Sequence, residues 1–281
     1  MADILFPPHP DLVDCVHSAF IKALPGGHYV LPASLQPMLL TVLSGRIVVA
    51  EQNRALEANT IHLCGGTREM RKAYAEPDTR ILTMGVKPGM ASALFGLPAL
   101  ELMDTRAALE DLLTPACSEA MGRCRKGLAA ATSPIEQVGS VTDLLLALRR
   151  MLARTPGLHV PLSLLNSPVK DLAEQFGLGT RQFERCFIAS YGQALRPFRH
   201  QLRCSQMLAR FVCGQREGRH WASVAAASGY CDQAHLTRDL VRFTGHTPGA
   251  LMDGIAKGDP ALWAYRTDSK LMTNLFGPTG Y

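Results

Sequence analysis

The chain has 281 residues, of which 47% are hydrophobic and 19% are charged. That length suits two domains, and the composition is ordinary for a globular protein. The sequence has no apolar run of about eighteen residues and no secretory leader pattern. It therefore predicts a cytoplasmic protein with no membrane partner.

The formal net charge of +5 comes from one part of the chain. Residues 1–162 contain 15 basic and 15 acidic residues, and residues 253–281 contain three of each. Residues 163–252 contain 11 basic and 6 acidic residues, and ten of the basic ones are arginine. The guanidinium fork suits phosphates and the guanine edge. This distribution favours a nucleic-acid partner, with a solvated charged surface as the alternative.

The eight cysteines form no Cys-x-x-Cys pair, and neither they nor the nine histidines show a spacing typical of zinc sites. We therefore expect reduced structural thiols, no metal and no cofactor.

Between Tyr29 and Val86 the sequence has short β-type runs separated by turn residues. The runs are Met38–Leu43, Arg46–Ala50, Thr60–Cys64 and Arg80–Val86, and Ser44-Gly45 links the first two as a hairpin. They predict a small, mainly antiparallel, barrel-like β domain.

A helical period follows the β-type runs, over Pro98–Leu113 and again over Ile135–Ala153. In the second segment apolar residues recur at three- and four-residue steps along one face. This face is either core for the β domain or a dimer interface.

The segment 155–161 is rich in Pro and Gly and is interpreted as a linker. We thus expect an α+β protein: a β-rich sensory or dimerisation domain over 1–154, an all-α domain over 162–252, and a tail over 253–281. The aromatic and apolar residues of the tail, among them Trp263, Tyr265, Leu275 and Phe276, indicate that it docks on the protein, at a place the sequence does not specify.

An internal repeat is the strongest pattern in the chain. Ala173 and Ala225 are 52 residues apart, as are Gly177 and Gly229. The later equivalents are 53 apart, namely Arg185 with Arg238, Phe187 with Leu240 and Gly192 with Gly245. The second copy therefore has one extra residue in its turn or at the start of its second helix.

Each copy has the pattern of a helix-turn-helix unit. Alanine allows close helix crossing, and the glycine after it suits the left-handed end of a helix. In the second helix, apolar residues four apart are buried and turn polar side chains outward. The outward side chains that can bond base edges are Arg181, Glu184 and Arg185 in the first copy, and Gln233, His235, Thr237 and Arg238 in the second.

A helix over Pro197–Val212 is predicted to join the two units and to hold their second helices about one DNA turn, roughly 34 Å, apart. Arg199 and Arg203 on this helix are candidate phosphate contacts. The alternative for either arginine is an ion pair with Asp171, Glu174 or Asp239.

Residues 169–187 and 224–248 resemble the paired helix-turn-helix domain of the AraC/XylS transcriptional regulators. The second copy carries Gly229-Tyr230, Asp232-Gln233, His235-Leu236 and Gly245-His246-Thr247-Pro248. The resemblance implies a sequence-specific regulator that inserts both second helices into adjacent major grooves of double-stranded DNA. The first copy departs from the family pattern at Gly179, in place of a Ser-type cap, and at Leu195, in place of a proline.

The N-terminal half resembles, more weakly, the sensory domains of some members around Lys87-Pro88-Gly89 and Phe95–Ala99. This resemblance implies a small effector or a homodimer, and a regulator of this kind has RNA polymerase as a further candidate partner.

An enzyme is not expected, because the hydrolase, phosphate-loop, zinc-protease and dinucleotide motifs are missing. The enzymatic alternative is a DNA-repair methyl acceptor with Cys64 as its reactive thiol. A structural cysteine is the competing reading of that residue. Helix-turn-helix corners can also be plain packing elements, so a module that binds no nucleic acid is a further alternative.

Overall fold

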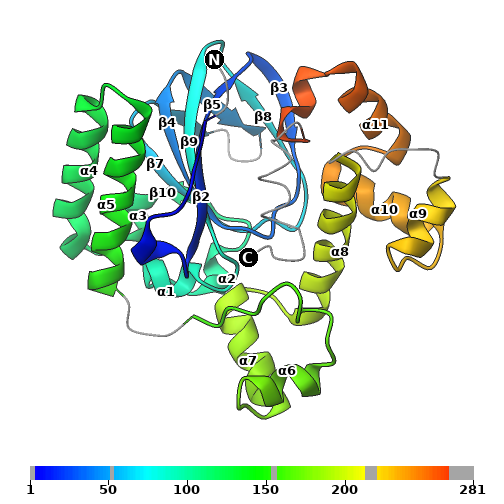
Figure 1. Cartoon of the computed structure of the whole chain (residues 1–281). Helices are drawn as coiled ribbons and strands as arrows, with labels where there is room; N and C mark the ends of the chain where they lie inside the picture. Colours follow the sequence, from blue (N-terminus) through cyan, green and yellow to red (C-terminus); the bar gives the residue numbers. More distant parts are fainter. Residues whose placement is uncertain (1–3, 51–53, 153–156, 213–219, 266–281) are drawn as a thin grey trace.

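The computed structural model describes residues 4–50, 54–152, 157–212 and 220–265. The N-terminal half forms two antiparallel β-sheets with helices beside them, and the C-terminal half is helical (Figure 1). The predicted α+β fold is confirmed. In the described part of the chain, no helix is both long and apolar enough to cross a bilayer.

The larger sheet has six strands in the order β1-β2-β9-β4-β7-β10. Along β9, Leu82, Met84 and Val86 face a core shared with the helices, while Ile81 and Thr83 face the second sheet. Alternation along a strand thus gives the sheet two buried faces. Its strands are β1 (Ile4–Phe6), β2 (Val16–Leu24), β4 (Met38–Ser44), β7 (Ile61–Cys64), β9 (Thr79–Val86) and β10 (Arg106–Ala108).

The smaller sheet has four strands in the order β3-β8-β5-β6. The predicted hairpin is wrong, because β4 and β5 lie in different sheets and pair with other strands. Gly45, with a φ of 77°, is the link where the chain passes from one sheet to the other. The strands are β3 (Gly27–Leu31), β5 (Arg46–Val49), β6 (Arg54–Glu57) and β8 (Arg71–Ala75).

Helices cover the outer face of the six-stranded sheet. The predicted helix over Ile135–Ala153 is α5, and its residues Val141, Leu144, Leu145 and Leu148 are buried in the core with the sheet. Its apolar face therefore packs within the chain, which favours the core reading over the dimer interface. The helical segments here are η1 (Pro10–Leu12), α1 (Ala91–Phe95), α2 (Ala99–Leu102), α3 (Leu109–Leu112), η3 (Pro115–Cys117), α4 (Ser118–Ala130) and α5 (Pro134–Leu152).

The predicted helix over Pro98–Leu113 is wrong. Two short helices, α2 and α3, flank the strand β10, which pairs with β7 through Ala107 and Leu63. Asp104 has a φ of 58° and interrupts the helical path. It also pairs with Arg68 at 3.5 Å and with Arg71 at 3.6 Å. Sheet pairing and these ion pairs override the local helical period.

The C-terminal half consists of α6 (Val169–Gln175), α7 (Thr180–Tyr191), α8 (Leu195–Val212), α9 (Trp221–Ala227), α10 (Gln233–Thr244), α11 (Pro248–Lys257) and η4 (Pro260–Tyr265). The helix α11 runs through the predicted start of the tail at residue 253. Trp263 in η4 then packs edge-on against Tyr29 of β3, with ring centroids 5.9 Å apart. The tail thus docks on the β-sheets, while Leu275 and Phe276 lie outside the described residues.

The helices α7 and α10, which are the second helices of the two predicted units, each end in a glycine that touches the N-terminal half. Gly192 ends α7 with a φ of 70°, and Gly245 ends α10 with a φ of 75°. A Cβ at position 192 would lie 2.3 Å from the carbonyl oxygen of Ala99, and one at position 245 would lie 3.2 Å from a methyl of Val30. These contacts need both the conformational freedom and the small size of glycine.

We expect Gly192→Ala to destabilise the chain more than Gly177→Ala. Both glycines have left-handed backbones, which cost an alanine about 1–2 kcal/mol. Nothing lies within 4 Å of a Cβ at position 177, whereas the Cβ at 192 meets a backbone carbonyl. Overpacking should add about 1–3 kcal/mol. Urea unfolding of both variants measures the difference, and equal losses would contradict the close contact.

Candidate nucleic-acid interface

The first helix-turn-helix unit is built from α6 and α7. Leu172 and Ala173 of α6 are buried against Phe183 and Phe187 of α7. Between the helices, Gly177 has a φ of 66°, which lets the chain reverse direction. The backbone N–H of Leu178 then donates to the carbonyl of Ala173 at 2.8 Å.

The second unit, α9 and α10, repeats these bonds. The N–H of Tyr230 donates to the carbonyl of Ala225 at 2.8 Å, and Gly229 has a φ of 73°. The helix α7 begins three residues after Gly177, whereas α10 begins four residues after Gly229. The extra residue of the second copy thus lies in its turn, one of the two places that the sequence allows.

The two second helices differ at their first residues. The carboxylate of Asp232 accepts from the backbone N–H of His235 at 2.6 Å and caps α10. The residue before α7 is Gly179, which has no side chain to do the same. Thr180 does not cap α7, because it is already the first residue of that helix.

The helix α7 presents polar side chains on the face opposite its aromatic core. Arg181, Glu184 and Arg185 are all exposed, as their predicted role requires. Gln182 is exposed too, and helical geometry places it nearer the centre of the open face than Glu184. Gln182 is not among the residues predicted from the sequence, although its angular position relative to Phe183 and Phe187 identifies it.

The helix α10 presents Gln233 and Arg238, both of which are exposed. Thr237 is half-buried at the edge of this face. The ring of His235 is also half-buried and packs edge-on against Tyr230, with centroids 5.2 Å apart. Arg238 lies near the centre of the face, and its Nε is 3.4 Å from the carbonyl of Ala234. Base contact by any of these residues stays a prediction.

The candidate phosphate contacts on α8, Arg199 and Arg203, have hydrogen-bond partners within the chain. Arg199 donates through Nε and a terminal nitrogen to the carbonyls of Leu165 and Ser167. Burial lowers the pKa of its guanidinium. Arg203 donates to the carbonyl of Gly229 at 2.8 Å and stacks on the ring of Tyr230. Both arginines stabilise segments before and within the helix-turn-helix units, and contact of either one with phosphate stays a prediction.

Cys64 lies at the end of β7, and burial raises the pKa of its thiol to about 11. A thiol with so high a pKa is a poor nucleophile near neutral pH, because the thiolate is the reactive form. This disfavours the DNA-repair methyl acceptor. A different group of possible metal ligands, His200, His235 and Asp239, is brought together where α8 meets α10.

A family model described as a helix-turn-helix domain matches residues 172–254, a range that spans both units. No curated protein sequence matches the chain significantly. Among solved structures, ToxT from Vibrio cholerae O395 is 10% identical with a TM-score of 0.42, covering 84% of this chain and 96% of that one. An unsaturated fatty acid-bound ToxT from Vibrio cholerae strain SCE256 is 9% identical, with a TM-score of 0.42 and coverage of 83% and 93%. The AraC-like transcriptional activator CuxR is 10% identical, with a TM-score of 0.30 and coverage of 71% and 85%.

Proposed function

We propose that this chain is a DNA-binding transcriptional regulator of the AraC type that reads two adjacent major-groove segments. The match of residues 172–254 to a helix-turn-helix family model supports the proposal. The observation that carries the proposal is the repeated unit with an exposed polar face on each second helix. Arginine and glutamine side chains on these faces match the donors and acceptors of base edges. A plain packing role would not require these two exposed faces.

We assign the base contacts to Arg181, Glu184 and Arg185 of α7 and to Gln233, Thr237 and Arg238 of α10. His235 also belongs to this set of predicted base contacts. It lies at the edge of the set, because its ring packs against Tyr230 inside the second unit. Arg238 has the most central position on its helix and is the best single test.

Arg238→Ala should lower affinity for the preferred DNA site by about 1–3 kcal/mol and relax base preference at one position, because one bidentate contact is lost. The preferred site is obtained by selection from a random duplex pool. Fluorescence anisotropy at several salt concentrations then measures affinity. Wild-type binding should weaken steeply with salt as phosphate counterions are released.

The matched control is Arg123→Ala, which removes an exposed arginine from α4, in the N-terminal half. It should leave site preference unchanged. Equal effects of the two substitutions, or a wild-type affinity that does not respond to salt, would contradict the assignment.

We further propose that a small effector occupies a cavity of about 340 Å³ between the two sheets. Most of its walls are apolar strand residues, among them Leu31, Leu40 and Val49. One side is completed by Ser205 and Leu208 of α8 and by Trp263 of η4, so residues from both halves of the chain line it. A cavity of this size and lining suits a mainly apolar small molecule.

Three polar atoms on the cavity-lining residues favour an effector that also carries a hydrogen-bond acceptor. The hydroxyls of Tyr29 and Thr83 and the indole N–H of Trp263 are buried and make no hydrogen bond among the described residues. Buried polar groups without partners are costly, so a ligand that accepts from them gains affinity. We infer an apolar molecule with a carbonyl, carboxylate or similar head.

Ala73→Phe should weaken binding of the apolar fluorescent probe anilinonaphthalene sulfonate by at least about tenfold. Ala73 lines the cavity from β8, and the larger ring would fill space that the probe needs. Circular dichroism melting shows whether the variant keeps its fold. A folded variant that binds the probe as tightly as the wild type would place the probe site elsewhere.

A further inference from the structure

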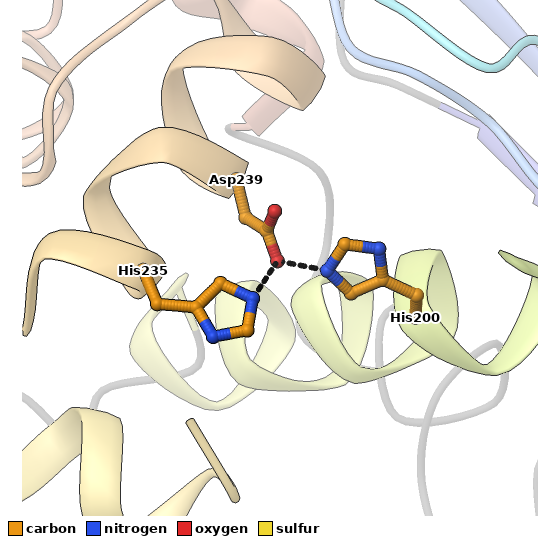
Figure 2. A group of neighbouring side chains, drawn as sticks. All are labelled: His200, His235 and Asp239. Atoms are coloured by element: carbon orange, nitrogen blue, oxygen red, sulfur yellow. Dashed lines mark ion pairs between the residues drawn. The ribbon is translucent and has the colours of Figure 1, made fainter. Parts of the chain in front are cut away.

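Three side chains meet where α8 packs against α10 (Figure 2). His200 comes from α8, and His235 and Asp239 come from α10. The Nε2 atom of His200 is 2.5 Å from Oδ2 of Asp239, and Nε2 of His235 is 3.9 Å from the same oxygen. His235 and Asp239 are four residues apart and therefore share one face of α10. The three potential ligand atoms lie within 4.8 Å of one another.

These atoms form a donor set that transition metals use. Two imidazole nitrogens and one carboxylate oxygen bind Zn²⁺ at about 2.0–2.2 Å, with water as a further ligand. Around such an ion the protein atoms would lie about 3–3.6 Å apart. Small side-chain rotations would lengthen the His200–Asp239 distance and bring the His235 ring closer to Asp239. The backbones of α8 and α10 need not move.

The carboxylate of Asp239 supplies the second, independent observation. Its side chain is only 8% exposed, and its Oδ2 atom lies 2.5 Å from Nε2 of His200 without the angles of a hydrogen bond. A buried carboxylate needs positive charge beside it, and a cation between it and the imidazoles would supply that charge. The histidine side chains are 33% and 31% exposed, so an ion and a water can reach the site.

Geometry sets the ligand group at three, because these are the ligand atoms that lie within 4.8 Å of one another. The neighbouring Arg203 is directed elsewhere, to the face of Tyr230 and the carbonyl of Gly229.

We propose that His200, His235 and Asp239 bind a divalent transition metal of the Zn²⁺ class, which ties the second helix of the second unit to α8. The bound ion holds the His235 ring inside the protein. It also stabilises the packing of α10 on α8, because a ligand that binds only the folded state stabilises it. The site can be tested independently of DNA binding, since metal uptake and thermal unfolding are both measured without DNA.

The test uses the untagged full chain, freed of metal by a chelator, and Co²⁺ as a spectroscopic probe for Zn²⁺. Titration should produce visible absorption that saturates at one equivalent, and Zn²⁺ should abolish it by displacement. Zn²⁺ should also raise the thermal midpoint of unfolding. His200→Gln and Asp239→Asn should each weaken metal binding at least about tenfold, because each removes a ligand.

Two variants serve as matched controls. His220→Gln removes an exposed histidine at the start of α9, and Cys231→Ser removes an exposed thiol in the turn before α10. Both should bind Co²⁺ like the wild type. Should Asp239→Asn fail to fold by circular dichroism, His200→Gln decides alone, since its side chain is one-third exposed. A wild-type chain that does not take up one equivalent at micromolar Co²⁺, or a folded His200→Gln chain that binds unchanged, would overturn the site.

Discussion

The arrangement of the whole molecule depends on the helix α8, because its side chains hold all the neighbouring parts in place. Arg199 bonds the segment before the first unit, and Arg203 bonds the turn of the second unit. Gln201 is buried and donates to the carbonyl of Thr67 in the β-sheet half at 2.8 Å. Each bond satisfies a backbone carbonyl that would otherwise need another partner. One helix therefore links α7, α10 and the sheets.

The β-sheet half contacts the C-terminal ends of α7 and α10. The carbonyl of Phe243, in the last turn of α10, accepts from the N–H of Ala33 at 2.8 Å. Gly192 brings the end of α7 against Ala99 of α2, and Gly245 brings the end of α10 close to Val30 of β3. The proposed effector cavity is lined by strand residues of both sheets and by Ser205 and Leu208 of α8, so an effector would touch the helix that bonds both units. This gives a physical route from the cavity to DNA affinity: a ligand that favours one spacing of the two halves biases the placement of the recognition helices.

Local patterns were sufficient to predict the helix-turn-helix units. The 52-residue spacing of Ala173 and Ala225 corresponds in the structure to two equivalent hydrogen bonds, made by Leu178 and Tyr230. The features that depend on contacts between distant residues could not be predicted in this way. The strand β10 exists because it pairs with β7, and Arg199 is directed inward because the segment before α6 passes beside it. The histidine and aspartate group was missed because one of its ligands comes from a different helix.

We propose that α8 holds α7 and α10 at a spacing that fits two adjacent major-groove segments. Methylation protection of guanine N7 on the selected DNA site, combined with hydroxyl-radical footprinting of the full chain, measures this spacing. We expect two protected major-groove patches about one helical turn, roughly 10 base pairs, apart on one face of the duplex. A single protected patch, or two patches on opposite faces, would contradict it.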